Sequence, residues 1–221
     1  TKTSILFKRI DKTSENIGFE LIFDGKKNTS FRPKIVKFFS MIQDYCPYLK
    51  DYHLLISSSN SFPHSSGIAS SASSMSALSL CIMSLEKKLS LIDDDYFFKK
   101  ASFISRIGSG SASRSVYSGI NFWGKHKELN NSSDLYSVKL TKNISPKFNK
   151  YRDVILIIDD KEKEVSSSVG HGLMNDNPFS KVRFNAANNN ITKLLQILAS
   201  GNLNDFCELV EGEALMLHSL M

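Results

Sequence analysis

The residues with the clearest chemical potential lie at positions 63–73, where small hydroxyl side chains surround Gly67 and precede an apolar helical pattern. Met75, Leu78 and Ile82 recur at the spacing of one helix face. Small side chains let a phosphate reach the first amides of a helix, which have no intrahelical partners and lie at the positive end of the dipole. The pattern therefore indicates a phosphate site. Because serine is also a favoured helix cap, a serine-rich loop that only caps the helix is an open alternative.

Glycine, serine and arginine come together a second time in residues 106–115. Two glycines leave space there, Ser109 and Ser111 supply hydroxyl groups, and Arg114 follows. An arginine guanidinium pairs bidentately with a phosphate or a carboxylate. The combination suits a ligand that carries a diphosphate at one end and a carboxylate at the other. A flexible glycine-serine turn, with Arg114 in a structural ion pair, fits the same bare pattern.

The elements that must position these two segments form an α+β pattern rather than regular βαβ units. The turn signal Asp24-Gly25 ends the second strand, and Gly201 ends the first of the two last helices. We place a domain boundary before the last predicted strand, which gives an N-terminal domain of residues 1–150 and part of a C-terminal domain at 151–221. The predicted strands cover residues 3–10, 17–23, 53–57, 119–123, 136–140 and 153–160, and the predicted helices cover 33–42, 75–85, 96–106, 191–198 and 206–220.

The bulk composition describes an ordinary globular protein of 221 residues, with 41% hydrophobic and 23% charged residues and a formal net charge of +6. The positive balance suits an anionic small molecule. Because the chain has no lysine-rich arm with interleaved aromatic residues, we expect no nucleic-acid partner. The three cysteines are far apart and form no CxxC pair, which argues against a disulfide framework and a zinc site. No apolar run approaches the ~20 residues of a membrane span and no signal peptide opens the chain, so we expect a cytoplasmic protein without a membrane partner.

Three segments resemble the motifs of one enzyme family. The string NSFPHSSGIASSASS from Asn60 is similar to the phosphate-binding motif of the GHMP kinase superfamily (galactose, homoserine, mevalonate and phosphomevalonate kinases), in the version of its decarboxylase branch. SRIGSGSASRS, followed by GINFWG, resembles the SRxGSGSACRS segment and the Gly-aromatic-Trp strand of diphosphomevalonate decarboxylases, with Ser113 at the position of the usual cysteine. KEVSSSVG at 163–170 is similar to the family's KEvSSxxGM region and points to Ser167.

The resemblance implies a GHMP-kinase-like fold, whose N-terminal domain is similar to that of a small-subunit ribosomal protein. It also implies the ATP-dependent and magnesium-dependent decarboxylation of mevalonate 5-diphosphate to isopentenyl diphosphate by a homodimer. Arg114 would hold the carboxylate end and stabilise charge as the carbon–carbon bond breaks. The substrate contacts that the resemblance implies are Ser109, Ser111, Arg114 and Ser167. The contacts to ATP phosphates that it implies are Ser66, Gly67, Ala69, Ser70, Ser71 and Ser73, with Ser71 also a magnesium ligand.

Two segments of the family have no counterpart in this sequence. The family's NIALIKYWGK strand would precede Thr1, and its DAGPN segment, which carries the proposed catalytic aspartate, would follow Met221. We therefore expect a chain that is truncated at both ends and inactive alone. Two alternatives stay open: a related mevalonate or phosphomevalonate kinase or decarboxylase, and a non-catalytic relic that lacks the aspartate.

Overall fold

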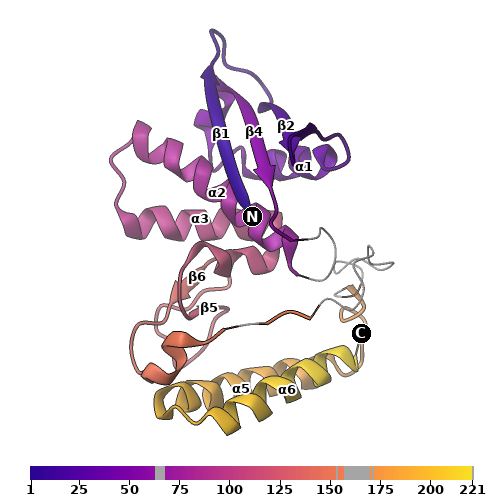
Figure 1. The fold of residues 1–221 in the computed structure, drawn as a ribbon, viewed down its shortest axis with the longest axis vertical. Coiled ribbons are helices and arrows are strands. Elements are labelled where there is room, and N and C mark those ends of the chain that lie inside the picture. The colour runs from indigo at the N-terminus through magenta and orange to yellow at the C-terminus, as the bar shows by residue number, and fades with distance from the viewer. Residues whose placement is uncertain (63–67, 153, 157–169, 171, 221) are drawn as a thin grey trace. The chain divides into compact units, whose positions relative to one another are not determined.

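The computed structural model describes residues 1–62, 68–152, 154–156, 170 and 172–220, which fold into two compact units (Figure 1). The first unit comprises residues 1–125 and 131–139, and the second comprises residues 126–130 and 140–221. Residues 140–150, which the sequence pattern assigns to the first domain, therefore belong to the second unit. The domain boundary after residue 150 stays a prediction.

A four-stranded sheet forms the base of the first unit, in the order β1-β4-β2-β3. β4 lies antiparallel to β1, with Ile56 opposite Ile5, and parallel to β2, with Ile56 level with Leu21. Asp24 and Gly25 have positive φ angles and close the turn between β2 and β3, which is the backbone conformation of a tight hairpin. The three predicted strands in this region are confirmed. The bounds are Lys2–Arg9 for β1, Gly18–Phe23 for β2, Lys26–Lys27 for β3 and Tyr52–Ser59 for β4.

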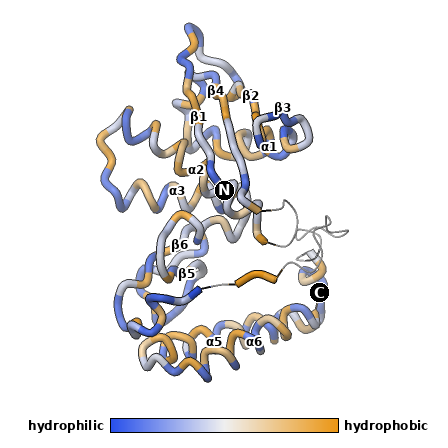
Figure 2. The backbone as a smooth tube through the Cα atoms, viewed as in Figure 1, coloured by the Kyte–Doolittle hydropathy of each residue, from blue (hydrophilic) through white to orange (hydrophobic). Residues whose placement is uncertain are grey.

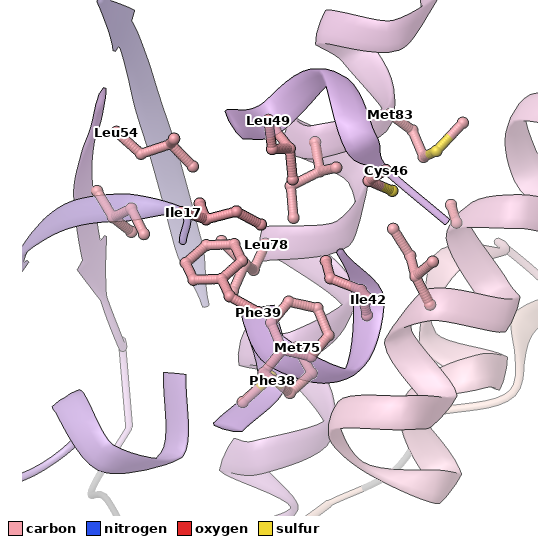
Figure 3. Close-up of a cluster of buried hydrophobic side chains, with 14 of the residues drawn as sticks. Ile17, Phe38, Phe39, Ile42, Cys46, Leu49, Leu54, Met75, Leu78 and Met83 are labelled. Carbon is pink, nitrogen blue, oxygen red and sulfur yellow. The ribbon is translucent and has the colours of Figure 1, made fainter. Parts of the chain in front are cut away.

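Three helices complete the core of the first unit, and all three are confirmed predictions. A proline lies in the first turn of α1, where the missing amide proton costs no hydrogen bond. Asp93 caps α3 by accepting a hydrogen bond from the Tyr96 amide at 2.7 Å. Figure 3 shows how Phe38 and Ile42 of α1 meet Met75 of α2 in the core. The bounds are Arg32–Ile42 for α1, Ser70–Leu89 for α2 and Asp94–Gly108 for α3.

Short elements connect and extend this core. The glycine-serine segment, which the sequence pattern suggests as a turn, forms a 3-10 helix, η2, from Gly110 to Val116. The predicted strands near 119–123 and 136–140 pair antiparallel as β5 and β6. The bounds are Pro47–Asp51 for η1, Asn121–Trp123 for β5 and Ser137–Lys139 for β6.

The second unit contains a 3-10 helix, η3 (Pro146–Lys150), and the helices α5 (Ser180–Ser200) and α6 (Leu203–His218). Both predicted helices are confirmed, and Gly201 ends α5 at a φ of 75°. Hydrophobic residues recur along both helices (Figure 2), and α6 has no buried residue. No helix within the described ranges has both the length and the apolar character of a membrane span.

One predicted strand, at residues 153–160, falls mostly outside the described residues. Of residues 153–160, the structure describes 154–156, which have no regular secondary structure. Val154 and Leu156 are largely exposed. A strand requires a neighbour to satisfy its backbone groups, and among the described residues none pairs with this segment. The mixed helix and sheet class is confirmed.

Candidate functional site

The first part of the candidate site is the beginning of α2. Its N-cap is Ala69, whose backbone is left-handed at a φ of 52°, and no side chain in the described part of the chain caps the helix. The N-cap residue is therefore not a serine, and the interpretation that the loop serines only cap this helix stays open, since Ser65 and Ser66 lie outside the described residues. Ser70 is buried and Ser71 is half-buried. Amides in the first turn of a helix attract negative charge, so this end of α2 can receive an anion.

The second part is the end of α3 and the start of η2. A Cβ atom on Gly108 would lie 2.6 Å from the sulfur of Met75 and 3.0 Å from a ring carbon of Phe38. A larger residue at this position would force the buried side chains of Met75 and Phe38 to shift. A Cβ atom on Gly110 would lie 3.1 Å from the indole ring of Trp123. The two glycines of the motif are explained by close packing rather than by loop flexibility.

The two parts meet directly. Ser71 Oγ, in the first turn of α2, lies 3.3 Å from Ser109 Oγ, which follows α3. The contact joins residues 38 positions apart in the sequence. The contact shows that the two glycine- and serine-containing segments lie side by side. The individual ligand contacts assigned to these residues stay predictions.

Arg114 lies in the last turn of η2 and is exposed. Its guanidinium makes no hydrogen bond or ion pair with any residue that the structure describes. The alternative in which Arg114 forms a structural ion pair therefore has no support in this part of the chain. Ser111, on the preceding turn, is half-buried. A free guanidinium beside accessible hydroxyls is a suitable arrangement for a phosphate or carboxylate group.

Ser73 has a different environment from Ser71. Its hydroxyl lies 2.6 Å from Thr1 Oγ1 and donates to the Ser70 carbonyl at 3.1 Å. Thr1 Oγ1 in turn donates to Asn60 Oδ1 at 2.6 Å. The Ser73 hydroxyl is thus engaged inside the chain, where it ties β1 and the end of β4 to the first turn of α2. A phosphate contact from Ser73 stays a prediction, and the sequence pattern gives no signal for Thr1.

A cavity of about 160 Å³ opens beside the start of α2. Its walls are mostly apolar, and Phe23 and Phe31 stand on one side with ring centroids 5.2 Å apart. Burial lowers the pKa of Lys34 at this wall. Ser71 belongs both to the cavity and to the contact with Ser109. Sequence reasoning missed this cavity because its lining comes from three strands and two helices that are separated along the chain.

Three predicted site residues lie outside the described residues: Ser66, Gly67 and Ser167. Their predicted roles are therefore untested.

Comparison with known proteins identifies the family. Residues 1–135 match the model of the diphosphomevalonate decarboxylase-like N-terminal domain. The chain belongs to this family. A diphosphomevalonate decarboxylase from Ganoderma lucidum is 35% identical over 126 residues, which are 56% of this chain and 29% of that protein. The family membership confirms the resemblance carried by the two motifs that lie within residues 1–135.

Solved structures extend the likeness to nearly the whole chain. A mevalonate diphosphate decarboxylase from Legionella pneumophila has a TM-score of 0.70 and 26% identity, over 99% of this chain and 65% of that one. A structure described as MDDEF in complex with MVAPP, AMPPCP and magnesium has a TM-score of 0.71 and 22% identity, over 99% of this chain and 62% of that one. These likenesses confirm the GHMP-kinase-like fold. The chain spans somewhat less than two-thirds of the length of these structures.

Proposed function

We propose that the protein carrying this sequence catalyses the ATP-dependent decarboxylation of mevalonate 5-diphosphate to isopentenyl diphosphate, in the mevalonate pathway of isoprenoid biosynthesis. Membership of the family supports the proposal. One geometric observation carries it: the 3.3 Å contact between Ser71 and Ser109 brings the start of α2 and the segment of Arg114 into one site. A phosphoryl donor bound at the first and a substrate bound at the second would be neighbours. Positioning of this kind is the main requirement of phosphoryl transfer.

The start of α2 is the proposed site of the ATP phosphates. The Ala72 amide donates to the Ala69 carbonyl at 2.9 Å, whereas the amides of Ser70 and Ser71 have no partner among the described residues. Ser71 adds a half-buried hydroxyl, and the first turn carries no acidic residue that would repel a phosphate. The left-handed backbone at Ala69 is strained for a residue with a Cβ atom, and such strain often accompanies a ligand site.

The cavity beside Ser71 is the proposed site of the nucleotide base. Its volume of about 160 Å³ is of the order of apolar cavities that hold one aromatic ring. Phe23 and Phe31 offer aromatic surface to a flat ring. Because Ser71 lines both this cavity and the phosphate site, one nucleotide could extend from one to the other.

Magnesium fits this site if the nucleotide brings most of its ligands. Among the described residues, no three His, Cys, Asp or Glu side chains gather in a way that could hold a metal ion. Mg²⁺ commonly retains waters and binds through phosphates with one or two protein oxygens. The Ser71 hydroxyl is the proposed protein ligand. When bound, the ion would neutralise charge on the transferred phosphoryl group.

The segment from Ser109 to Arg114 is the proposed substrate site. In the reaction that the family carries out, the tertiary hydroxyl of mevalonate diphosphate is first phosphorylated. The new phosphate then leaves with its bonding electrons, carbon dioxide departs, and the electrons of the broken carbon–carbon bond form the double bond of isopentenyl diphosphate. Arg114 would hold the carboxylate and stabilise charge in this step, and Ser109 and Ser111 would orient the substrate by hydrogen bonds.

We further propose that the protein is a cytoplasmic homodimer, as the family resemblance implies. Size-exclusion chromatography with light scattering tests the oligomeric state, and a dimer mass is the expected result.

One assay separates the proposal from its alternatives. The full protein that carries this sequence, with any residues beyond positions 1 and 221, is incubated with ATP, magnesium and mevalonate diphosphate labelled at the carboxyl carbon. Release of labelled carbon dioxide together with isopentenyl diphosphate is the expected outcome. Phosphorylated substrate without carbon dioxide would instead indicate a related kinase. Binding of both compounds without any reaction would indicate the non-catalytic alternative.

A further inference from the structure

Four serines with no exposed surface lie beneath the proposed substrate site. Ser102 and Ser105 belong to α3, Ser113 belongs to η2, and Ser137 begins β6. Each has a relative exposure of 0%. A buried hydroxyl without a partner destabilises a protein, so the partners of these groups reveal what they hold in place.

Two of the hydroxyls converge on one backbone atom. Ser102 Oγ donates to the Ser113 carbonyl at 2.8 Å, and Ser137 Oγ donates to the same carbonyl at 3.1 Å. Ser102 Oγ also accepts a hydrogen bond from the Ser137 amide at 2.8 Å. The Ser102 hydroxyl therefore both donates and accepts, and it joins three elements of the first unit at a single point.

The bonded carbonyl belongs to the peptide group that links Ser113 to Arg114. A peptide group is planar, so fixing its oxygen also fixes the plane that carries the Arg114 nitrogen. The Ser113 hydroxyl donates to the Gly110 carbonyl at 3.0 Å and closes the 3-10 turn from inside. The segment is thus held on its buried side, whereas Arg114, the next residue, is exposed.

We infer that Ser102 and Ser137 are positioning residues, which hold η2 so that Arg114 presents its guanidinium to an anionic group of the substrate. The identity of that substrate rests on the proposed function. Neither serine touches the substrate in this account, since both are fully buried. Preorganised donors bind an anion more tightly than mobile ones because less order is lost on binding.

Ser105 provides a matched control. It lies on the same helix, has the same exposure of 0%, and donates to the Ser102 carbonyl at 2.9 Å within α3. Its hydroxyl does not bond to η2. Replacement of Ser105 by alanine therefore removes a buried hydroxyl without releasing the segment of Arg114.

Trp123 provides a readout that does not depend on activity. It is the single tryptophan of the chain. Its ring lies against the start of η2, because a Cβ atom on Gly110 would be 3.1 Å from Cη2. Its indole nitrogen donates to the Asp134 carbonyl at 2.9 Å, which fixes the ring from the other side. Movement of η2 should therefore change the emission of Trp123.

The experiment compares three variants, Ser102→Ala, Ser137→Ala and Ser105→Ala, with the unsubstituted protein. Arg114→Ala is the reference for complete loss of anion binding. Inorganic diphosphate and mevalonate diphosphate are titrated by calorimetry, and tryptophan emission is recorded without ligand. We expect Ser102→Ala to lower the affinity for both compounds by about tenfold, the equivalent of one or two hydrogen bonds. Ser137→Ala should lower the affinity less, since the Ser102 hydroxyl still donates to the Ser113 carbonyl. Both variants should shift the emission of Trp123.

Ser105→Ala should leave the emission and both affinities unchanged. Equal losses in Ser105→Ala and Ser102→Ala would show general destabilisation and overturn the inference, as would an unchanged affinity in Ser102→Ala. If Ser102→Ala does not fold, Ser137→Ala and the nearly isosteric Ser102→Cys carry the comparison.

If diphosphate binds through Arg114 with this pattern of losses but no carbon dioxide is released, the proposed reaction fails and the positioning role stands. If Ser102→Ala and the unsubstituted protein release carbon dioxide equally, the proposed reaction stands and the positioning role fails.

Discussion

At the scale of single residues, Arg114 differs from a structural arginine such as Arg32. The Arg32 guanidinium donates to the Phe19 carbonyl at 3.0 Å and lies over the Phe19 ring, 4.6 Å from its centroid. The Arg114 guanidinium has no such contact among the described residues and is exposed. A long cationic side chain without internal partners contributes little to stability and is available to a ligand.

Replacement of Arg114 by alanine should therefore lower turnover of mevalonate diphosphate by ~100-fold or more, the effect of losing a charged hydrogen-bonding pair. The unfolding temperature should remain within about 1 °C of its original value, because surface substitutions change stability little. Arg32→Ala is the control and should show the opposite pattern, with lower stability and nearly normal turnover. Normal turnover in Arg114→Ala would contradict the role that we assign to it.

The hydroxyl of Ser71 gives a second prediction at this scale. Ser71→Ala keeps the helix amides but removes the hydroxyl that faces Ser109, so we expect the KM for ATP to rise by about tenfold. Ser84→Ala, which removes an exposed hydroxyl bonded to Leu80 on a later turn of α2, is the control. Steady-state kinetics with varied ATP and magnesium measure both. An unchanged KM in Ser71→Ala would mean that the amides alone hold the phosphates.

At the scale of elements, α2 contains one hydroxyl with no evident role. Ser79 has an exposure of 0%, and its Oγ has no hydrogen-bond partner among the described residues. Ser76, one turn earlier, donates to the Ser73 carbonyl at 3.0 Å. Ser79→Ala should therefore increase the free energy of unfolding by about 1 kcal/mol, because it removes an unpaired buried polar group and favours the helix. Urea unfolding measures the change. A loss of stability equal to that of Ser76→Ala would show that the Ser79 hydroxyl does have a partner.

The elements also show what sequence reasoning could and could not reach. Long periodic helices such as α2 and α3 were predictable, because the apolar spacing that defines them is local. The 3-10 helix η2 was not predictable, because hydroxyl groups outside the segment hold its backbone. These hydroxyls belong to Ser102 and Ser137. The two candidate ligand-binding segments were recognisable by composition and motif. Their contact through Ser71 and Ser109 required the fold.

At the scale of the whole molecule, a buried polar cluster makes stability depend on pH. Cys46 is fully buried, and burial raises the pKa of its thiol from 9.0 to about 11. Burial also raises the pKa of Tyr48. Burial alone would lower the pKa of Lys100, but its hydrogen bond to Glu86 at 2.8 Å and the attraction of neighbouring anionic groups together raise the pKa. In the folded state all three titrating groups therefore hold their protons to a higher pH than in the unfolded chain.

Because the unfolded chain loses these protons first, the free energy of unfolding should fall as the pH rises above about 9. The two pKa units of Cys46 alone correspond to on the order of 2 kcal/mol by pH 11. Urea unfolding at pH 7, 9 and 10.5 measures the slope. Cys46→Ala should reduce the slope between pH 9 and 11, at some cost in packing at pH 7. A urea midpoint of unfolding that stays constant across this pH range would contradict the burial of Cys46, Tyr48 and Lys100.

The central claim is that one site holds a nucleotide at the start of α2 and a phosphorylated acid at η2. The most direct test is a crystal structure of the protein with mevalonate diphosphate, a non-hydrolysable ATP analogue and magnesium. We predict that the terminal phosphate of the analogue lies within hydrogen-bond distance of Ser71, and that the guanidinium of Arg114 contacts the carboxylate or diphosphate of the acid. Ligands bound at separate places, with neither Ser71 nor Arg114 in contact, would contradict the account.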